Sequence, residues 1–277
     1  MPAPAPSPPE LVDAVERATT ELLRVLEALS PADLVAPSRL PGWSRCTIVC
    51  HLRYGAAASA RMTEDALAGR TTAFYPDGRD RQRPGTLALA PGESAGDACR
   101  SLRDESGRLG RLWSSVPGGE WGTVVRESAG NPDLGDIDLA TLALLRLTEV
   151  EVHGADLDVG LDRWSDVFVT AALPVRLARL DRQRRVGRDD PLVGTTWWLR
   201  PVDGPAHAVT LGPDRTEVRP ATATGTASGD DLPPPDAVVE GTAADLLALL
   251  LGRPAPTVTY GGDVERARAF ARAYGGP

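Results

Sequence analysis

Four helix-length segments, separated by breaks rich in proline and glycine, fill the first 160 residues of the chain. Apolar residues recur in them with intervening charges, at the spacing of one face of a helix. The pattern predicts helices over residues 10–29, 44–68, 93–116 and 136–156, with Ser44 as the N-cap of the second. Four consecutive helices of this length are typical of a four-helix bundle.

The pattern changes after about residue 160. Short runs of β-branched and aromatic residues, separated by Pro, Gly and Asp, predict the strands of an antiparallel sheet. These runs lie at residues 194–200, 208–211, 216–219, 237–240 and 257–260, with helices expected over 166–184, 242–251 and 264–274. We therefore expect an α+β protein, with a helical bundle in residues 1–162 and a small α+β domain with an antiparallel sheet in residues 163–277.

Composition narrows the classes of partner. The formal net charge is −8, and the sequence contains no block of basic residues that resembles a nucleic-acid-binding arm. Both observations argue against nucleic-acid binding. No apolar run approaches the roughly 18–20 residues that span a bilayer, and the start of the chain does not resemble a secretory signal. Three cysteines do not suggest a disulfide framework. We expect a soluble cytoplasmic protein, and the exclusive use of arginine over lysine suggests a GC-rich, actinobacterial source.

Two of the three histidines lie where a metal site would need them. His51 and His153 fall in two different predicted helices, and Glu149 precedes His153 by four residues, so that these two side chains share a helix face. Two imidazoles and one carboxylate form a three-ligand set with room for a fourth ligand, as in catalytic zinc sites. With a divalent cation this set has a net charge of about +1, which favours capture of an anionic sulfur.

The residues around Glu149 and His153 have several interpretations. Glu151 is two residues from both, so it points away from their shared face. Arg146 lies one turn before Glu149 and Asp156 almost one turn after His153. Both interpretations of this pair stay open: groups that orient the ligands, or ordinary ion pairs on a helix surface.

Three residues near His51 are expected to have structural roles. Cys46 and Cys50 do not converge with His51 on one point of a helix, so we expect them to be buried small residues rather than ligands. Trp43 is expected to close the mouth of the bundle, with Gly42 allowing the tight entry of the chain into the second helix.

The motifs Leu40-Pro-Gly-Trp43 … His51-Leu52 and Arg146-x-x-Glu149-x-x-x-His153-x-x-Asp156-Leu157 resemble those of the mycothiol-dependent maleylpyruvate isomerase family. That family belongs to the DinB-like metal-binding helical bundles. The resemblance covers most of the chain, because the second half is similar to the family's small α+β domain, which is related to sterol-carrier folds.

The resemblance implies a divalent metal, usually zinc, held by His51, Glu149 and His153. It also implies mycothiol, a low-molecular-weight thiol, as co-substrate. In the family's isomerase the thiolate adds to a cis double bond, rotation follows, and elimination gives the trans product; relatives transfer the thiol onto other electrophiles. Arg253 is the nearest match to an arginine that contributes to catalysis from the family's second domain.

The sequence does not name the small electrophile, whose selection we expect to depend on loop residues 70–91 and 117–135. Two other functions stay open on the sequence alone. The second domain suits a non-catalytic module that binds a lipid or another small molecule. The metal site also suits a hydrolase, in which the metal activates water instead of a thiol.

Overall fold

The protein is described by a computed structural model that covers residues 5–128, 134–221 and 235–276. The chain divides into two compact units: one is Pro6–Phe168, and the other contains the residues from Val169 onward together with Ala5. The boundary expected from the sequence, between residues 162 and 163, lies shortly before this division.

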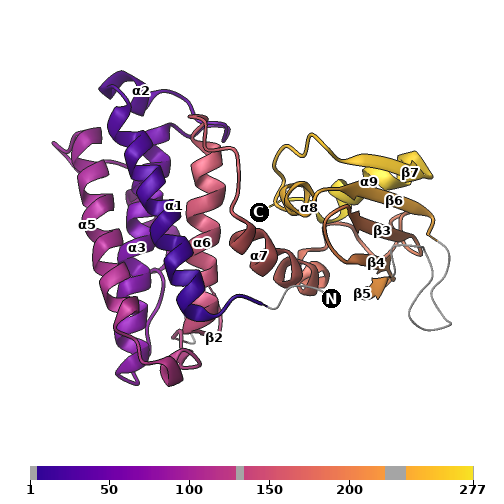
Figure 1. Ribbon diagram of the computed structural model, residues 1–277, viewed down its shortest axis with the longest axis horizontal. Helices are drawn as coiled ribbons and strands as arrows, with labels where there is room; N and C mark the ends of the chain where they lie inside the picture. The colour runs from indigo at the N-terminus through magenta and orange to yellow at the C-terminus, as the bar shows by residue number, and fades with distance from the viewer. Residues whose placement is uncertain (1–4, 129–133, 222–234, 277) are drawn as a thin grey trace. The chain divides into compact units, whose positions relative to one another are not determined.

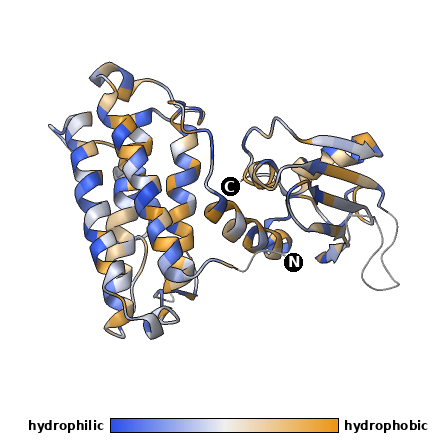
Figure 2. Ribbon diagram, viewed as in Figure 1, coloured by the Kyte–Doolittle hydropathy of each residue, from blue (hydrophilic) through white to orange (hydrophobic). Residues whose placement is uncertain are grey.

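Four long helices build the first unit (Figure 1). α1 and α3 each pack against both α5 and α6, which closes the bundle, and Figure 2 shows apolar and polar stretches on each of these helices. The four-helix arrangement expected from the periodicity is confirmed. The helices are α1 (Pro8–Ala28), α3 (Arg45–Leu67), α5 (Ala95–Ser114) and α6 (Leu139–Asp156).

Short elements connect the long helices. They are α2 (Pro31–Val35), α4 (Arg79–Thr86), the 3-10 turn η1 (Gly118–Glu120), and a two-stranded antiparallel ribbon of β1 (Val124–Val125) and β2 (Ile137–Asp138). The helix α4 lies within residues 70–91, where the sequence indicated only a long connection. Only Thr86 of α4 is buried, so the helix has no apolar periodicity that would reveal it.

Two side-chain caps fix where the helices of the predicted ligands begin. The Ser44 hydroxyl accepts a hydrogen bond from the Thr47 backbone N–H at 3.1 Å, as expected from the sequence. The Asp138 carboxylate does the same for Thr141 at 2.7 Å. A fixed first residue sets the rotation of each helix, and therefore the direction in which His51 and Glu149 point.

The second unit is a five-stranded sheet with helices. The strand order is β5-β4-β3-β6-β7, and every neighbouring pair is antiparallel except β3 and β6, which are parallel. The expected α+β class is confirmed, with a sheet that is antiparallel apart from this pair. Helix α7 (Asp166–Ala178) crosses the division between the units, and the remaining elements are η2 (Leu180–Gln183), β3 (Thr196–Pro201), β4 (Ala206–Leu211), β5 (Thr216–Ala221), β6 (Ala237–Gly241), α8 (Ala243–Leu250), β7 (Thr259–Gly262) and α9 (Val264–Tyr274).

The aromatic core of the second unit lies between the sheet and its last helix. Trp197 of β3 is fully buried, and its ring contacts those of Phe270 and Tyr274 on α9.

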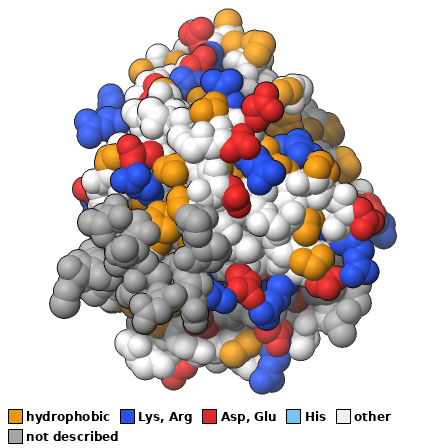
Figure 3. All heavy atoms as spheres, turned by 90° about the vertical axis from the view of Figure 1, so that its right-hand side faces the viewer, with side chains coloured by type: hydrophobic (Ala, Val, Ile, Leu, Met, Phe, Trp, Pro, Cys, Tyr) orange, Lys and Arg blue, Asp and Glu red, His pale blue; other side chains and the backbone are white. Residues whose placement is uncertain are grey.

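On the face drawn in Figure 3, acidic and basic side chains are interspersed, with no large patch of one sign among the coloured residues. In the described ranges, none of the helices has the length and apolar character required to cross a bilayer.

Candidate metal centre

A tight turn precedes the helix that carries His51. The Trp43 N–H donates to the Leu40 carbonyl at 3.0 Å, with Pro41 and Gly42 between them and Gly42 at a φ of +79°. This is the sequence and geometry of a type II turn, which requires a positive φ at its third residue. The backbone N–H and the hydroxyl of Ser38 both donate to the Trp43 carbonyl at 2.9 Å. The turn therefore fixes Trp43 directly before α3.

Hydrogen bonds join this turn to the end of α6. The Arg39 N–H donates to the Asp156 carbonyl at 2.8 Å, and Nε of Arg45 donates to the Leu157 carbonyl at 2.7 Å. The last carbonyls of a helix lack partners within the helix, so these donors satisfy groups that would otherwise be unpaired. The start of α3 and the end of α6 are thereby held together, which places His51 opposite His153.

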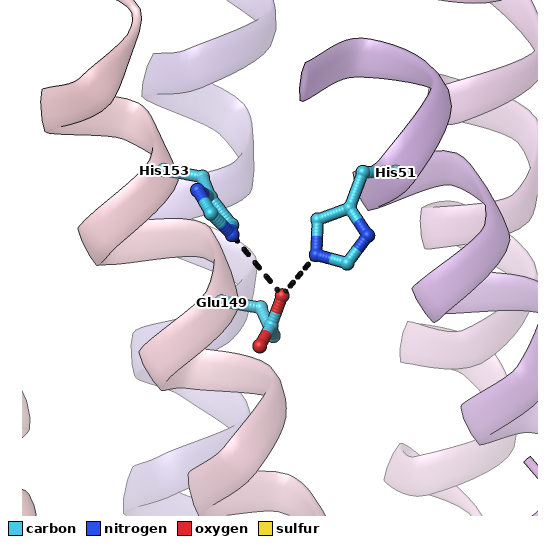
Figure 4. A group of neighbouring side chains, drawn as sticks. All are labelled: His51, Glu149 and His153. Atoms are coloured by element: carbon cyan, nitrogen blue, oxygen red, sulfur yellow. Dashed lines mark hydrogen bonds and ion pairs between the residues drawn. The ribbon is translucent and has the colours of Figure 1, made fainter. Parts of the chain in front are cut away.

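The three predicted ligands meet between these two helices (Figure 4). One carboxylate oxygen of Glu149, Oε2, lies 2.7 Å from Nε2 of His51 and 3.5 Å from Nε2 of His153. The two imidazole rings are nearly perpendicular, with their centroids 4.9 Å apart. The structure thus brings together the three residues that the sequence singled out.

The charges of the three groups support one another. Burial opposes the charged form of Glu149, but the hydrogen bonds with His153 and His51 outweigh it and hold the pKa of this carboxyl well below 4.5. Burial likewise opposes the charged form of His153, yet the hydrogen bonds with Asp156 and Glu149 raise the pKa of this imidazole from 6.5 to about 9. The raised pKa favours the protonated form of His153, whose positive charge compensates the carboxylate of Glu149.

Asp156 and Trp43 fix the orientation of His153. Nδ1 of His153 lies 2.9 Å from a carboxylate oxygen of the buried Asp156, so Nδ1 carries the proton and Nε2 faces Glu149. The Trp43 ring stacks on the His153 ring at 6.1 Å and 19°, and meets the edge of the His51 ring at 5.6 Å. Of the two interpretations of Asp156, the structure supports the one in which it orients a ligand.

Arg146 lies in the interior of the bundle rather than on its surface. Its guanidinium donates to the Leu52 carbonyl at 2.9 Å and to the Ser106 hydroxyl at 3.4 Å. Burial lowers the pKa of Arg146 to about 10, against the opposite effect of the Glu149 charge. Arg146 therefore bridges α6 to α3 beside His51, and the interpretation as a surface ion pair is wrong.

Three further residues lie away from the ligands. Glu151 accepts a hydrogen bond from the Ser165 hydroxyl at 2.5 Å, and burial raises the pKa of its carboxyl. It points away from the ligands, as the helical spacing predicts. Cys46 and Cys50 are buried in the apolar core of the bundle, as expected.

Arg253 belongs to the second unit, whereas all three candidate ligands belong to the first. Its guanidinium donates to the Leu251 carbonyl at 2.8 Å, just after α8. Its role in catalysis stays a prediction.

The donor set fits a divalent cation. One atom from each of the three side chains lies within 4.8 Å of the other two, and two imidazole nitrogens with one carboxylate oxygen are donors that zinc accepts. The imidazole side chains are only 14% and 13% exposed, for His51 and His153 respectively, whereas Glu149 is 43% exposed. All three candidate ligands are therefore only partly exposed, and Glu149 is the most exposed of them.

Two solved structures share the fold of this chain. A crystal structure of the mycothiol-dependent maleylpyruvate isomerase matches with a TM-score of 0.65 and 19% identity, over 94% of this chain and 95% of that one. A histidine-to-alanine mutant of that isomerase matches with the same TM-score and coverage at 18% identity. At such identities the likeness shows a shared fold. A search of curated proteins finds no match.

The family comparison covers the unit that holds the candidate centre. Residues 15–158, just over half of the chain, match the family described as the mycothiol maleylpyruvate isomerase N-terminal domain. The matched range includes all three candidate ligands as well as Trp43 and Asp156. The chain belongs to the mycothiol-dependent maleylpyruvate isomerase family.

Proposed function

We propose that this protein is a metal-dependent enzyme that uses mycothiol as a nucleophile, for cis–trans isomerisation or for thiol transfer to a small electrophile. The observation that carries the proposal is the convergence of His51, Glu149 and His153 in a chain of this family. The donor types favour zinc as the metal. Three free cysteines and a thiol co-substrate fit a reducing compartment, and we place the protein in the cytoplasm.

The need for a cation follows from thiol chemistry. A free thiol has a pKa of about 8.5, so only a few per cent is the nucleophilic thiolate at pH 7. A bound divalent cation would supply the positive charge that removes this proton from the sulfur. The two imidazoles and the Glu149 carboxylate leave a net charge of about +1 on such a centre, which attracts a thiolate without strongly suppressing its reactivity.

In the isomerisation, the sulfur forms a bond to one carbon of a cis double bond, and the π electrons move onto the conjugated carbonyl group. Rotation about the resulting single bond and cleavage of the same sulfur–carbon bond give the trans product and return the thiol. In thiol transfer, the sulfur–carbon bond is retained in the product. We propose that Arg253 binds a negative charge of the electrophile.

Metal analysis of purified variants tests the centre. We expect about one equivalent of metal in the wild-type protein and almost none in His51→Ala or His153→Ala, because each variant leaves only two ligands. His207→Ala is the matched control, since it removes the third histidine of the chain from the other unit. If either ligand variant retains stoichiometric metal, the assignment is wrong.

Cobalt substitution tests the thiol. A thiolate that binds cobalt gives an intense charge-transfer absorption in the near ultraviolet, which water does not give. We expect this band to appear when mycothiol is added to the cobalt protein, and to be absent in His153→Ala. A cobalt-loaded protein whose spectrum ignores mycothiol would contradict the thiol-dependent function and favour activation of water.

A further inference from the structure

The helix α4 presents two arginines to aromatic rings, and one of these rings, that of Trp43, contacts both imidazoles of the candidate centre. Arg79 and Arg83 are four residues apart and therefore share one face of α4. The guanidinium carbon of Arg79 lies 5.9 Å from the centre of the Tyr75 ring, and that of Arg83 lies 5.9 Å from the centre of the Trp43 ring. Both separations are within the range of cation–π attraction.

Arg83 is the one next to the candidate ligands. Trp43, on which its guanidinium lies, contacts the rings of both His153 and His51. Arg83 is thus separated from the two imidazoles by a single aromatic side chain. It is half-buried, and it comes from the connection 70–91, which the sequence indicated as a determinant of substrate choice.

No described carboxylate forms an ion pair with Arg83. Other arginines of the same unit are neutralised: Arg53 pairs with Glu93, and Arg70 pairs with Asp65 at 2.7 Å. A guanidinium over a ring face uses its π surface for that contact, while its N–H donors lie in its own plane. Those donors match the two oxygens of a carboxylate.

We propose that Arg83 binds a carboxylate of the electrophile and so makes the enzyme specific for carboxylate-bearing substrates. This inference rests on the proposed function. The ligands with a divalent cation have a net charge of about +1, and Arg83 adds a second positive charge beside them. A thiolate and a substrate carboxylate then balance these two charges, whereas a neutral electrophile leaves Arg83 without an anionic partner.

Two probe molecules that differ in a single carboxylate test the inference by binding alone, without turnover. Zinc-loaded protein is titrated calorimetrically with maleate and with maleamate, in which one carboxylate is replaced by an amide. We expect the wild-type protein to prefer maleate, and Arg83→Gln to weaken maleate binding by about tenfold or more, the effect of losing a charged hydrogen bond. The preference for maleate over maleamate should largely disappear in this variant, and Arg83→Lys should retain part of it, because it keeps the charge without the planar donors.

Arg81→Gln is the matched control, because Arg81 is exposed on the same helix and the substitution removes the same charge. We expect this control to bind maleate within about twofold of wild type. Circular dichroism and zinc content are measured on each sample. The inference is overturned if zinc-loaded wild-type protein does not bind maleate, if folded Arg83→Gln binds it as wild type does, or if Arg81→Gln loses as much affinity. A wild-type protein that holds no metal overturns the proposed function itself, and the inference with it.

Discussion

Asp156 is the residue that determines which nitrogen of His153 is available to a metal. Its carboxylate accepts a hydrogen bond from the Nδ1–H of His153 at 2.9 Å, and the Asp156 side chain is almost fully buried. An acceptor of this kind fixes the tautomer and the ring orientation of a histidine ligand. The site therefore depends on a fourth side chain that does not itself reach the centre.

Replacing Asp156 by Asn should weaken metal binding by about 10- to 100-fold, because the amide is a weaker acceptor for the imidazole N–H. Competition with a chromophoric chelator measures the change. Asp158→Asn is the control, since it makes the same substitution at an exposed position two residues further along the chain, where Asn also tolerates the positive φ of 58°. Equal affinities in the two variants would show that Asp156 does not support the ligand.

Metal binding should strengthen as the pH rises. In the metal-free protein His153 has a pKa of about 9, so below that pH the cation must displace its proton. We expect the apparent affinity to rise about tenfold per pH unit between pH 6.5 and 8.5 and to level off above pH 9. Calorimetry in buffers with different ionisation enthalpies measures the proton released. An affinity that stays constant over this range would contradict the protonated state of His153.

At the scale of elements, the turn before α3 matters as much as the helices. Residues 40–43 form it, and hydrogen bonds from the flanking Arg39 and Arg45 attach it to the end of α6. Two ligand-bearing helices are thus held in position at their ends by one short segment. A change in this segment should affect both stability and metal binding, although none of its residues binds the metal.

Gly42→Ala should lower the free energy of unfolding by about 1–2 kcal/mol, because a side chain disfavours the positive φ of this position. Gly118→Ala is the control: a Cβ atom has free space at both glycines, but only Gly42 has a positive φ. Denaturant titration of the two variants separates the backbone effect from steric crowding. The turn assignment fails if both variants are equally stable.

The sequence predicted the long helices and the shared face of two ligands, but it did not predict α4 or the hydrogen bonds that attach the turn to α6. Helical periodicity revealed the four long helices, and the four-residue spacing of Glu149 and His153 placed them on one face. Periodicity says nothing about α4, whose residues are mostly exposed, or about the bonds from Arg39 and Arg45 to α6. The chain has many arginines and no lysine, so no pattern marks the few arginines whose partners lie more than a hundred residues away.

At the scale of the whole molecule, the chain divides its proposed chemistry between two units. The three candidate ligands belong to the helical unit, and Arg253 belongs to the unit that contains the sheet. The first unit's motifs are local in sequence and were predicted residue by residue. The parallel pairing of β3 with β6 was not, because neighbouring short strands in a sequence do not reveal which strands pair across a long connection.

Arg253→Met should therefore separate metal binding from turnover. We expect full metal content, because no ligand changes, and a loss of thiol-dependent turnover of about tenfold or more if Arg253 binds a charge of the substrate. Arg188→Met serves as the control, since it removes an exposed arginine of the same unit. Unchanged turnover in Arg253→Met would exclude the role that the family resemblance implies, and loss of metal would indicate a structural role instead.

The interaction of Glu149 with two imidazoles has a consequence for the stability of the site when no cation is bound. A proton on His153 does electrostatically what a bound ion would do, since it compensates the carboxylate and keeps the three side chains assembled. The helices of the bundle pack through apolar side chains that need no metal, so we expect it to stay folded when a cation is removed, unlike small zinc domains. Removal and reloading of a cation would then exchange one positive charge for another without refolding.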